Sequence, residues 1–122
     1  MSADPSQTLL LGGNAHISVS LVPRMVNRHG LVAGATGTGK TITLQVMAQA
    51  FSDLGVPVLV PDIKGDFSGI AKPGVMSDKL QQRAASVGLG AITAASAPTV
   101  FWDVHGEHGH PLRLTISDFG PL

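Results

Sequence analysis

One segment of the chain combines glycines, a lysine and hydroxyl side chains in the pattern G-x-x-x-x-G-K-[ST]: Gly34, Ala35, Thr36, Gly37, Thr38, Gly39, Lys40 and Thr41. Glycines let a backbone curl closely enough for successive N–H groups to point at one small anion. Lys40 would add a mobile positive charge for β- and γ-phosphate oxygens, which makes it the candidate catalytic residue. The Thr41 hydroxyl can ligate Mg²⁺. We therefore expect this segment to bind the phosphates of a nucleotide such as ATP together with Mg²⁺.

Hydrolysis needs a further carboxylate to hold the magnesium shell or to position water. Two apolar runs end in an aspartate, Val58–Asp62 and Val100–Asp103, and neither has an Asp-Glu pair. Asp62 would follow a strand close to the phosphate loop, at the strand end where ligands bind in open α/β sheets. It is therefore a candidate metal ligand, with Lys64 and Asp66 behind it. The alternative is that Asp62 is a turn residue at a strand end.

A second cluster of metal-binding residue types is the segment His105–His110, which holds three histidines and Glu107. Such residues can ligate zinc. Glycines interrupt the segment, however, and no rigid element would hold the side chains in place. We expect an exposed hairpin loop between two strands rather than a metal site.

The phosphate-binding pattern requires a strand before it and a helix after it, and the sequence supplies both. Leu31–Ala33 is a short apolar run, and Lys40–Leu54 has apolar residues at helical spacing. Gly55 is suited to end that helix. The apolar run Val58–Val60 then predicts a strand covered on both faces. Together these elements predict a βαβ unit of a parallel sheet.

The flanking segments predict further elements. Ile17–Leu21 alternates apolar and polar residues, as in a half-buried strand. Ser77 is suited to cap a second helix that Gly88 ends. Val100–Trp102 predicts a third core strand, and the alternation from Leu112 to Ile116 predicts a last strand with one solvated face.

Composition limits the remaining possibilities. The 122 residues suggest one small domain, with a flexible N-terminus at 1–8 and the folded part at 9–122. Eight basic residues balance eight acidic ones, so a highly basic nucleic-acid arm is excluded. The absence of cysteine excludes disulfides and cysteine–zinc sites. No apolar run approaches a membrane span and no secretory signal is visible, so we expect a cytoplasmic protein without a membrane partner.

Several segments resemble the bacterial HerA-like ATPases, which belong to the HerA/FtsK branch of P-loop NTPases. One such segment is the stretch from Asn27 through the Gly34–Thr41 loop, whose Walker A pattern is generic to a superfamily. The more specific parts are Asp62–Gly69 and Trp102–Pro111, followed by Ser117–Pro121. The resemblance covers nearly the whole chain from about Leu9.

The resemblance implies an α/β fold with a P-loop, RecA- or Rossmann-like parallel-sheet core, to which we expect β-hairpin elements at both ends. It also implies ATP and Mg²⁺ as ligands and a ring-forming DNA translocase or helicase, a homo-oligomer (hexamer) in the family. Members are several times longer, and this chain stops at Leu122, before the expected Asp-Glu strand and arginine finger. We therefore expect an incomplete core that binds ATP, hydrolyses it weakly or not at all, and meets DNA only within the full-length oligomeric parent.

Two other functions stay open at this point. The chain could be a small self-contained phosphotransferase, although no arginine-rich lid or acceptor site is recognisable. It could also be a non-catalytic interaction domain that retains the loop. ATP affinity, DNA-stimulated ATPase activity and phosphoryl transfer to a small acceptor would separate the three functions.

Overall fold

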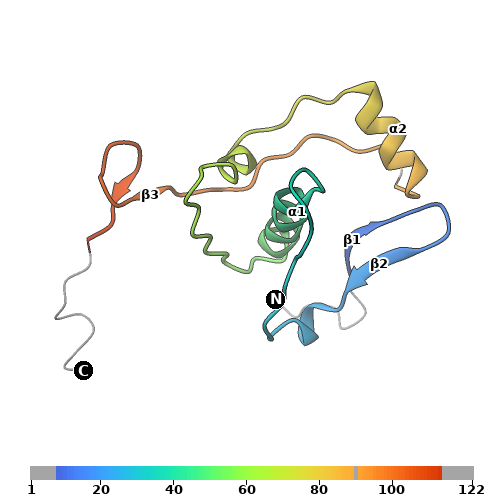
Figure 1. Ribbon diagram of the computed structural model, residues 1–122, viewed down its shortest axis with the longest axis horizontal. Coiled ribbons are helices and arrows are strands. Elements are labelled where there is room, and N and C mark those ends of the chain that lie inside the picture. Colours follow the sequence, from blue (N-terminus) through green and yellow to red (C-terminus); the bar gives the residue numbers. More distant parts are fainter. Residues whose placement is uncertain (1–7, 90, 114–122) are drawn as a thin grey trace.

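The computed structural model describes residues 8–89 and 91–113. Its elements follow the order β1-β2-η1-α1-η2-α2-β3-β4, and long irregular segments connect them (Figure 1). The element bounds are β1 Leu9–Gly13, β2 Ser18–Leu21, η1 Pro23–Met25, α1 Lys40–Asp53, η2 Ser68–Ala71, α2 Asp78–Ser86, β3 Trp102–Asp103 and β4 His110–Pro111.

An antiparallel hairpin of β1 and β2 stands at the N-terminal side of the described chain. Its turn is closed by Asn14, whose Oδ1 accepts the backbone N–H groups of His16 and Ile17, each at 2.9 Å. This confirms the predicted strand ending at Leu21 and the N-terminal hairpin. The expectation of a half-buried strand is wrong, because Val19 is exposed and no residue of β2 is buried.

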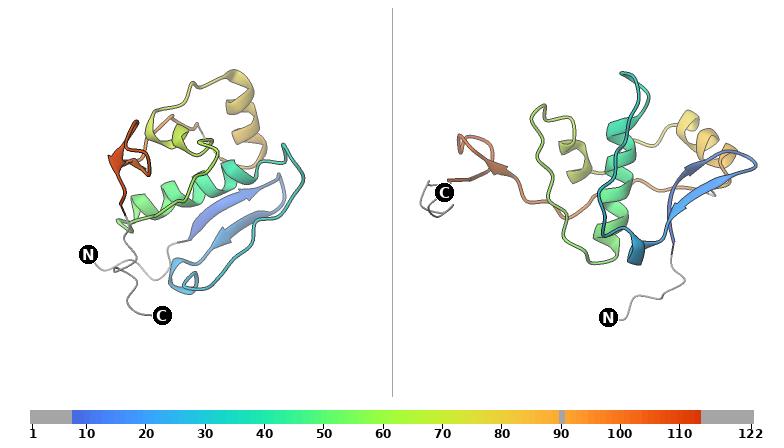
Figure 2. Two further views of the ribbon diagram at one scale, coloured as in Figure 1. Left: turned by 60° about the vertical axis from the view of Figure 1, so that its left-hand side comes forward. Right: turned by 60° about the horizontal axis from the view of Figure 1, so that its bottom comes forward.

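The helix α1 confirms the sequence prediction to within one residue. It begins at Lys40 and ends at Asp53, and Gly55 follows it with φ = +77°, a conformation that glycine adopts without a steric penalty. The hairpin runs alongside the helix (Figure 2). The buried residues of this contact region are Leu9 on β1 and Ala48 on α1. The small side chain of Ala48 suits close approach of a helix to a strand.

The helix α2 also begins where the sequence predicts. The Ser77 Oγ accepts the Leu80 N–H at 3.3 Å, which satisfies one of the free donors of the first turn. The chain then returns toward α1, and two contacts secure this return. The Gln81 side chain hydrogen-bonds both backbone groups of Ile92, and the Ala97 N–H donates to the Ile70 carbonyl oxygen at 3.0 Å.

The predicted strands Leu31–Ala33 and Val58–Val60 form no β-ladder, with each other or with another described segment. A strand is stabilised by a hydrogen-bonded neighbour, and α1 does not bring these two segments side by side as paired strands. Roughly a third of consecutive strands in sheets are not direct neighbours. The P-loop parallel-sheet core therefore stays a prediction.

The C-terminal pair differs from the predicted hairpin. Of the third expected strand, Val100–Trp102, only Trp102 pairs; together with the following Asp103 it pairs in parallel with His110 and Pro111. The Asp103 carboxylate accepts N–H groups from the loop that follows it, and this loop makes a complete turn. β4 therefore runs beside β3 in the same direction. The expected last strand is not formed at residues 112–113, and its remainder lies outside the described residues.

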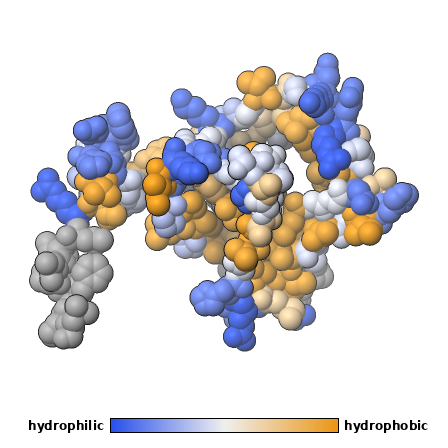
Figure 3. Space-filling model, viewed as in Figure 1, coloured by the Kyte–Doolittle hydropathy of each residue, from blue (hydrophilic) through white to orange (hydrophobic). Residues whose placement is uncertain are grey.

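Many apolar side chains remain open to solvent, across the middle of the face seen in Figure 3 and elsewhere. The accessible surface is 10267 Å², against the roughly 6,200 Å² that area scaling gives for a compact monomer of this size. Leu31, before the phosphate loop, is 89% exposed. None of the helices described is both long and apolar enough to cross a membrane.

Candidate phosphate-binding loop and its surroundings

The predicted phosphate loop closes around one carbonyl oxygen, that of Ala35. The Thr38 hydroxyl donates to it at 2.8 Å, the Thr38 N–H at 3.4 Å and the Lys40 ammonium at 2.6 Å. A Cβ at Gly34 would lie 2.5 Å from the Thr38 hydroxyl oxygen, so a side chain at this position would displace the Thr38 hydroxyl. The loop therefore has a defined curl, with Lys40 folded across it.

The loop turns again at Gly37 and Gly39, after the bend around the Ala35 carbonyl oxygen. Their φ angles are +79° and +93°, in the left-handed region that favours glycine, and a Cβ at either position would meet no atom within 4 Å. The loop therefore faces open space at these two residues, and a ligand could approach the backbone closely.

The loop leads directly into the positive end of α1. Gly39 is the N-cap and has no side chain with which to cap the helix, and no acidic residue lies in the first turn. The first N–H groups of the helix are thus left for an external acceptor. Among residues 8–89 and 91–113, no carboxylate pairs with Lys40. An uncapped helix end beside an unneutralised ammonium fits a phosphate group.

Thr41, the predicted magnesium ligand, contacts the loop that follows residue 61. Its hydroxyl donates to Oδ2 of Asp66 at 3.3 Å. Gln45, one helical turn further, donates its side-chain amide to the carbonyl oxygens of Asp66 at 3.4 Å and Phe67 at 3.3 Å. The apolar spacing within the helix does not single out Gln45 as a site residue. Its i+4 spacing from Thr41 was the signal that both residues meet the same partner.

The Asp62 carboxylate shapes this same loop. Its Oδ1 accepts the Gly65 N–H and its Oδ2 accepts the Phe67 N–H, each at 2.9 Å. Both oxygens are therefore engaged with backbone, as expected of a turn-forming aspartate. The role of Asp62 as a magnesium ligand stays a prediction.

Asp103 plays a similar part in the C-terminal loop. Its carboxylate accepts the N–H groups of His105 at 2.9 Å, Glu107 at 2.9 Å and His108 at 3.0 Å. These hydrogen bonds hold the pKa of Asp103 below its ordinary value. The bond from His105 contributes most, followed by those from His108 and Glu107. In the part of the chain that the structure describes, no three His, Cys, Asp or Glu residues gather closely enough to hold a metal ion. The histidine segment is an exposed loop organised by Asp103.

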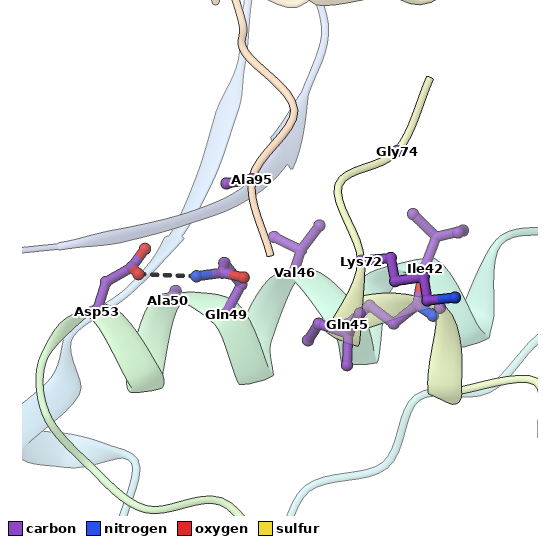
Figure 4. A pocket seen from close by; sticks show the side chains of 11 residues that line it. Ile42, Gln45, Val46, Gln49, Ala50, Asp53, Lys72, Gly74 and Ala95 are labelled. Atoms are coloured by element: carbon purple, nitrogen blue, oxygen red, sulfur yellow. Dashed lines mark hydrogen bonds between the residues drawn. The ribbon is translucent and has the colours of Figure 1, made fainter. Parts of the chain in front are cut away.

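A groove of about 450 Å³ runs along α1 on the side of η2. Figure 4 shows Gln49 hydrogen-bonded to Asp53 at one end of it, and Lys72 and Ile42 at the other end. The groove contains no residue of the phosphate loop and is distinct from it. Its lining consists of Ile42, Gln45, Val46, Gln49, Ala50, Asp53, Gly69, Ile70, Lys72, Gly74 and Ala95.

Comparison with known proteins extends over nearly the whole chain. The sequence model of a family described as "Helicase HerA-like C-terminal" matches residues 7–122. The chain is also similar to the DNA double-strand break repair helicase HerA of Sulfolobus acidocaldarius, with 29% identity over 66 residues. That match covers 54% of this chain and 13% of the relative. No solved structure matches the chain.

Proposed function

The chain belongs to the helicase HerA-like C-terminal family, and from this premise we propose that it is the ATP-binding segment of a DNA translocase or helicase. In this proposal the loop Gly34–Thr41 holds the nucleotide phosphates together with Mg²⁺. The observation that supports this proposal is the uncapped N-terminus of α1 beside the Lys40 ammonium. Within the residues that the structure describes, no carboxylate forms an ion pair with this ammonium.

The loop residues have separate roles in this proposal. The N–H groups of the glycine-rich loop and of the first helical turn donate to the phosphate oxygens. The Lys40 ammonium leaves the Ala35 carbonyl oxygen and binds the β- and γ-phosphates. The phosphate oxygens are stronger acceptors than the carbonyl oxygen because they carry negative charge. The Thr41 hydroxyl oxygen is the protein ligand for Mg²⁺. When bound, Mg²⁺ neutralises part of the charge on the phosphate oxygens.

The DNA-directed part of the proposal rests on the family and on the relative, whose name describes a double-strand break repair helicase. The chain's match spans about an eighth of that relative, so movement along DNA and assembly into a ring belong to the proposal for the whole protein. A DNA-stimulated ATPase activity of the complete protein is the expected result. A complete protein whose ATPase activity is indifferent to DNA would contradict this part.

Nucleotide binding is tested by titrating the chain with a fluorescent ADP analogue. Lys40→Ala should weaken binding roughly ten- to a hundredfold, the usual contribution of a charge-assisted hydrogen bond. Lys79→Ala is the matched control, because Lys79 lies in α2, outside the loop. Equal affinities for the Lys40→Ala chain and the unaltered chain would overturn the proposal. The absence of any nucleotide binding would favour an interaction domain that retains the loop.

A further inference from the structure

The loop at residues 62–68 is held against the first two turns of α1 by three hydrogen bonds. The Thr41 hydroxyl donates to the Asp66 carboxylate at 3.3 Å. The Gln45 amide donates to the carbonyl oxygens of Asp66 and Phe67 at 3.4 and 3.3 Å. Two residues one turn apart on the helix thus engage two consecutive residues of the loop. The position of Asp66 beside Thr41 is therefore defined by more than one contact.

The two aspartates of this loop have different environments. Asp62 uses both carboxylate oxygens for the N–H groups of Gly65 and Phe67, and thereby bends the loop. Gly65 has φ = +75°, which permits the bend. The side chain of Asp66 is exposed, and its hydrogen bond to Thr41 is long. Asp66 is therefore the carboxylate of this loop that lies next to Thr41, the proposed magnesium ligand, and that remains accessible to a metal ion.

We propose that Asp66 is a positioning residue for Mg²⁺ at the nucleotide site, an inference that rests on the function proposed above. A hydroxyl group has one proton to donate and two lone pairs to offer. When the Thr41 hydroxyl donates a hydrogen bond to Asp66, the lone pairs of the Thr41 oxygen are directed away from the carboxylate. They are then available to the cation. Mg²⁺ usually keeps several water molecules, and the Asp66 carboxylate is an acceptor for them.

The effect of Asp66 should appear in metal binding rather than in phosphate binding. Residues that orient a metal ligand typically contribute ten- to a hundredfold to metal affinity. The negative charge of Asp66 does not help to bind an anionic nucleotide, so its removal should leave the metal-free affinity unchanged or slightly higher. Lys40 should show the opposite pattern, because it acts on the phosphates themselves.

The test is to measure ADP affinity of the full chain with and without Mg²⁺, and to follow Mn²⁺ by electron paramagnetic resonance. In Asp66→Asn, the gain in ADP affinity from Mg²⁺ and the affinity for Mn²⁺ in the presence of ADP should fall roughly ten- to a hundredfold. Metal-free ADP affinity should not fall. Asp53→Asn is the matched control, since Asp53 is an exposed carboxylate at the far end of α1. Gln45→Ala should reduce the Mg²⁺ gain less than Asp66→Asn, because it loosens the loop but keeps the carboxylate.

The possible failures can be told apart. If the unaltered chain binds no ADP, or Lys40→Ala binds it equally well, the proposed function fails and the inference fails with it. If Lys40→Ala weakens ADP binding but Asp66→Asn retains the full Mg²⁺ gain, the inference alone is overturned. A loss in Asp66→Asn that is as large without metal as with it also overturns the inference, because it would place Asp66 in loop structure rather than in metal binding.

Discussion

The Lys40 ammonium lies 2.6 Å from the carbonyl oxygen of Ala35, where the hydroxyl and N–H groups of Thr38 also point. In the proposed function this contact must break, since the ammonium is then needed by the phosphates. Addition of ADP should therefore shift the NMR resonance of the Ala35 carbonyl carbon and of the Lys40 ammonium. Gly74, away from the loop, provides the reference resonance. ADP binding without any change at Ala35 would contradict the exchange of partners.

The left-handed conformation of Gly39 should make this position intolerant of other residues. Gly39 has φ = +93°, and a side chain in the left-handed region costs about 1–2 kcal/mol. Gly39→Ala should lower the free energy of unfolding by about that amount and weaken nucleotide binding, as measured by urea denaturation and ADP titration. Gly74→Ala is the control, because Gly74 has a negative φ and open space around its Cβ position. Equal stability of the two variants would contradict the strain.

The side chain of Gln81 should hold the segment that returns from α2. Its amide donates to the Ile92 carbonyl oxygen at 2.8 Å, and its carbonyl accepts the Ile92 N–H at 3.3 Å. Gln81→Ala should cost roughly 1 kcal/mol and speed hydrogen exchange of the Ile92 N–H about fivefold. Gln82→Ala, at the exposed neighbouring position, should change this rate little. The expectation fails if both variants exchange alike.

The loop held by Asp103 should be sensitive to acid. The N–H groups of His105, His108 and Glu107 lower the pKa of the Asp103 carboxyl in the folded chain. The stabilisation is therefore complete above the ordinary aspartate pKa of about 4, and is lost as the pH falls through the lowered value. NMR titration of these three amides should show a common midpoint below about pH 4. Asp103→Asn should abolish that titration, and a midpoint at or above the ordinary value would contradict the prediction.

Much of the local structure could be predicted because its causes are local. The apolar spacing after Lys40 predicts α1, Gly55 suits its end, and Ser77 suits the start of α2. All three are confirmed. The interactions responsible lie within a few residues of one another along the chain, so the order of residue types is sufficient to predict them.

Pairing between distant segments could not be predicted in the same way. The runs Leu31–Ala33 and Val58–Val60 have the composition of strands but no partner in the described chain. The segment around Asp103 pairs in parallel, not as a hairpin, because a carboxylate collects the N–H groups of the loop. Composition expresses a preference for extended backbone, whereas a ladder also requires a neighbour in register.

The sequence by itself determined the family, the glycine-rich loop and the helix that follows it, because these depend on residue types at fixed short spacing. Only the tertiary structure decided that Gln45 contacts the loop at residues 62–68. It also decided that Asp66 rather than Asp62 accepts the hydrogen bond of the Thr41 hydroxyl group. Thr41 and Asp66 are 25 positions apart, and their meeting depends on how α1 and the loop pack. No spacing rule along the chain specifies such a contact, because the packing of two elements is set by all the side chains between them.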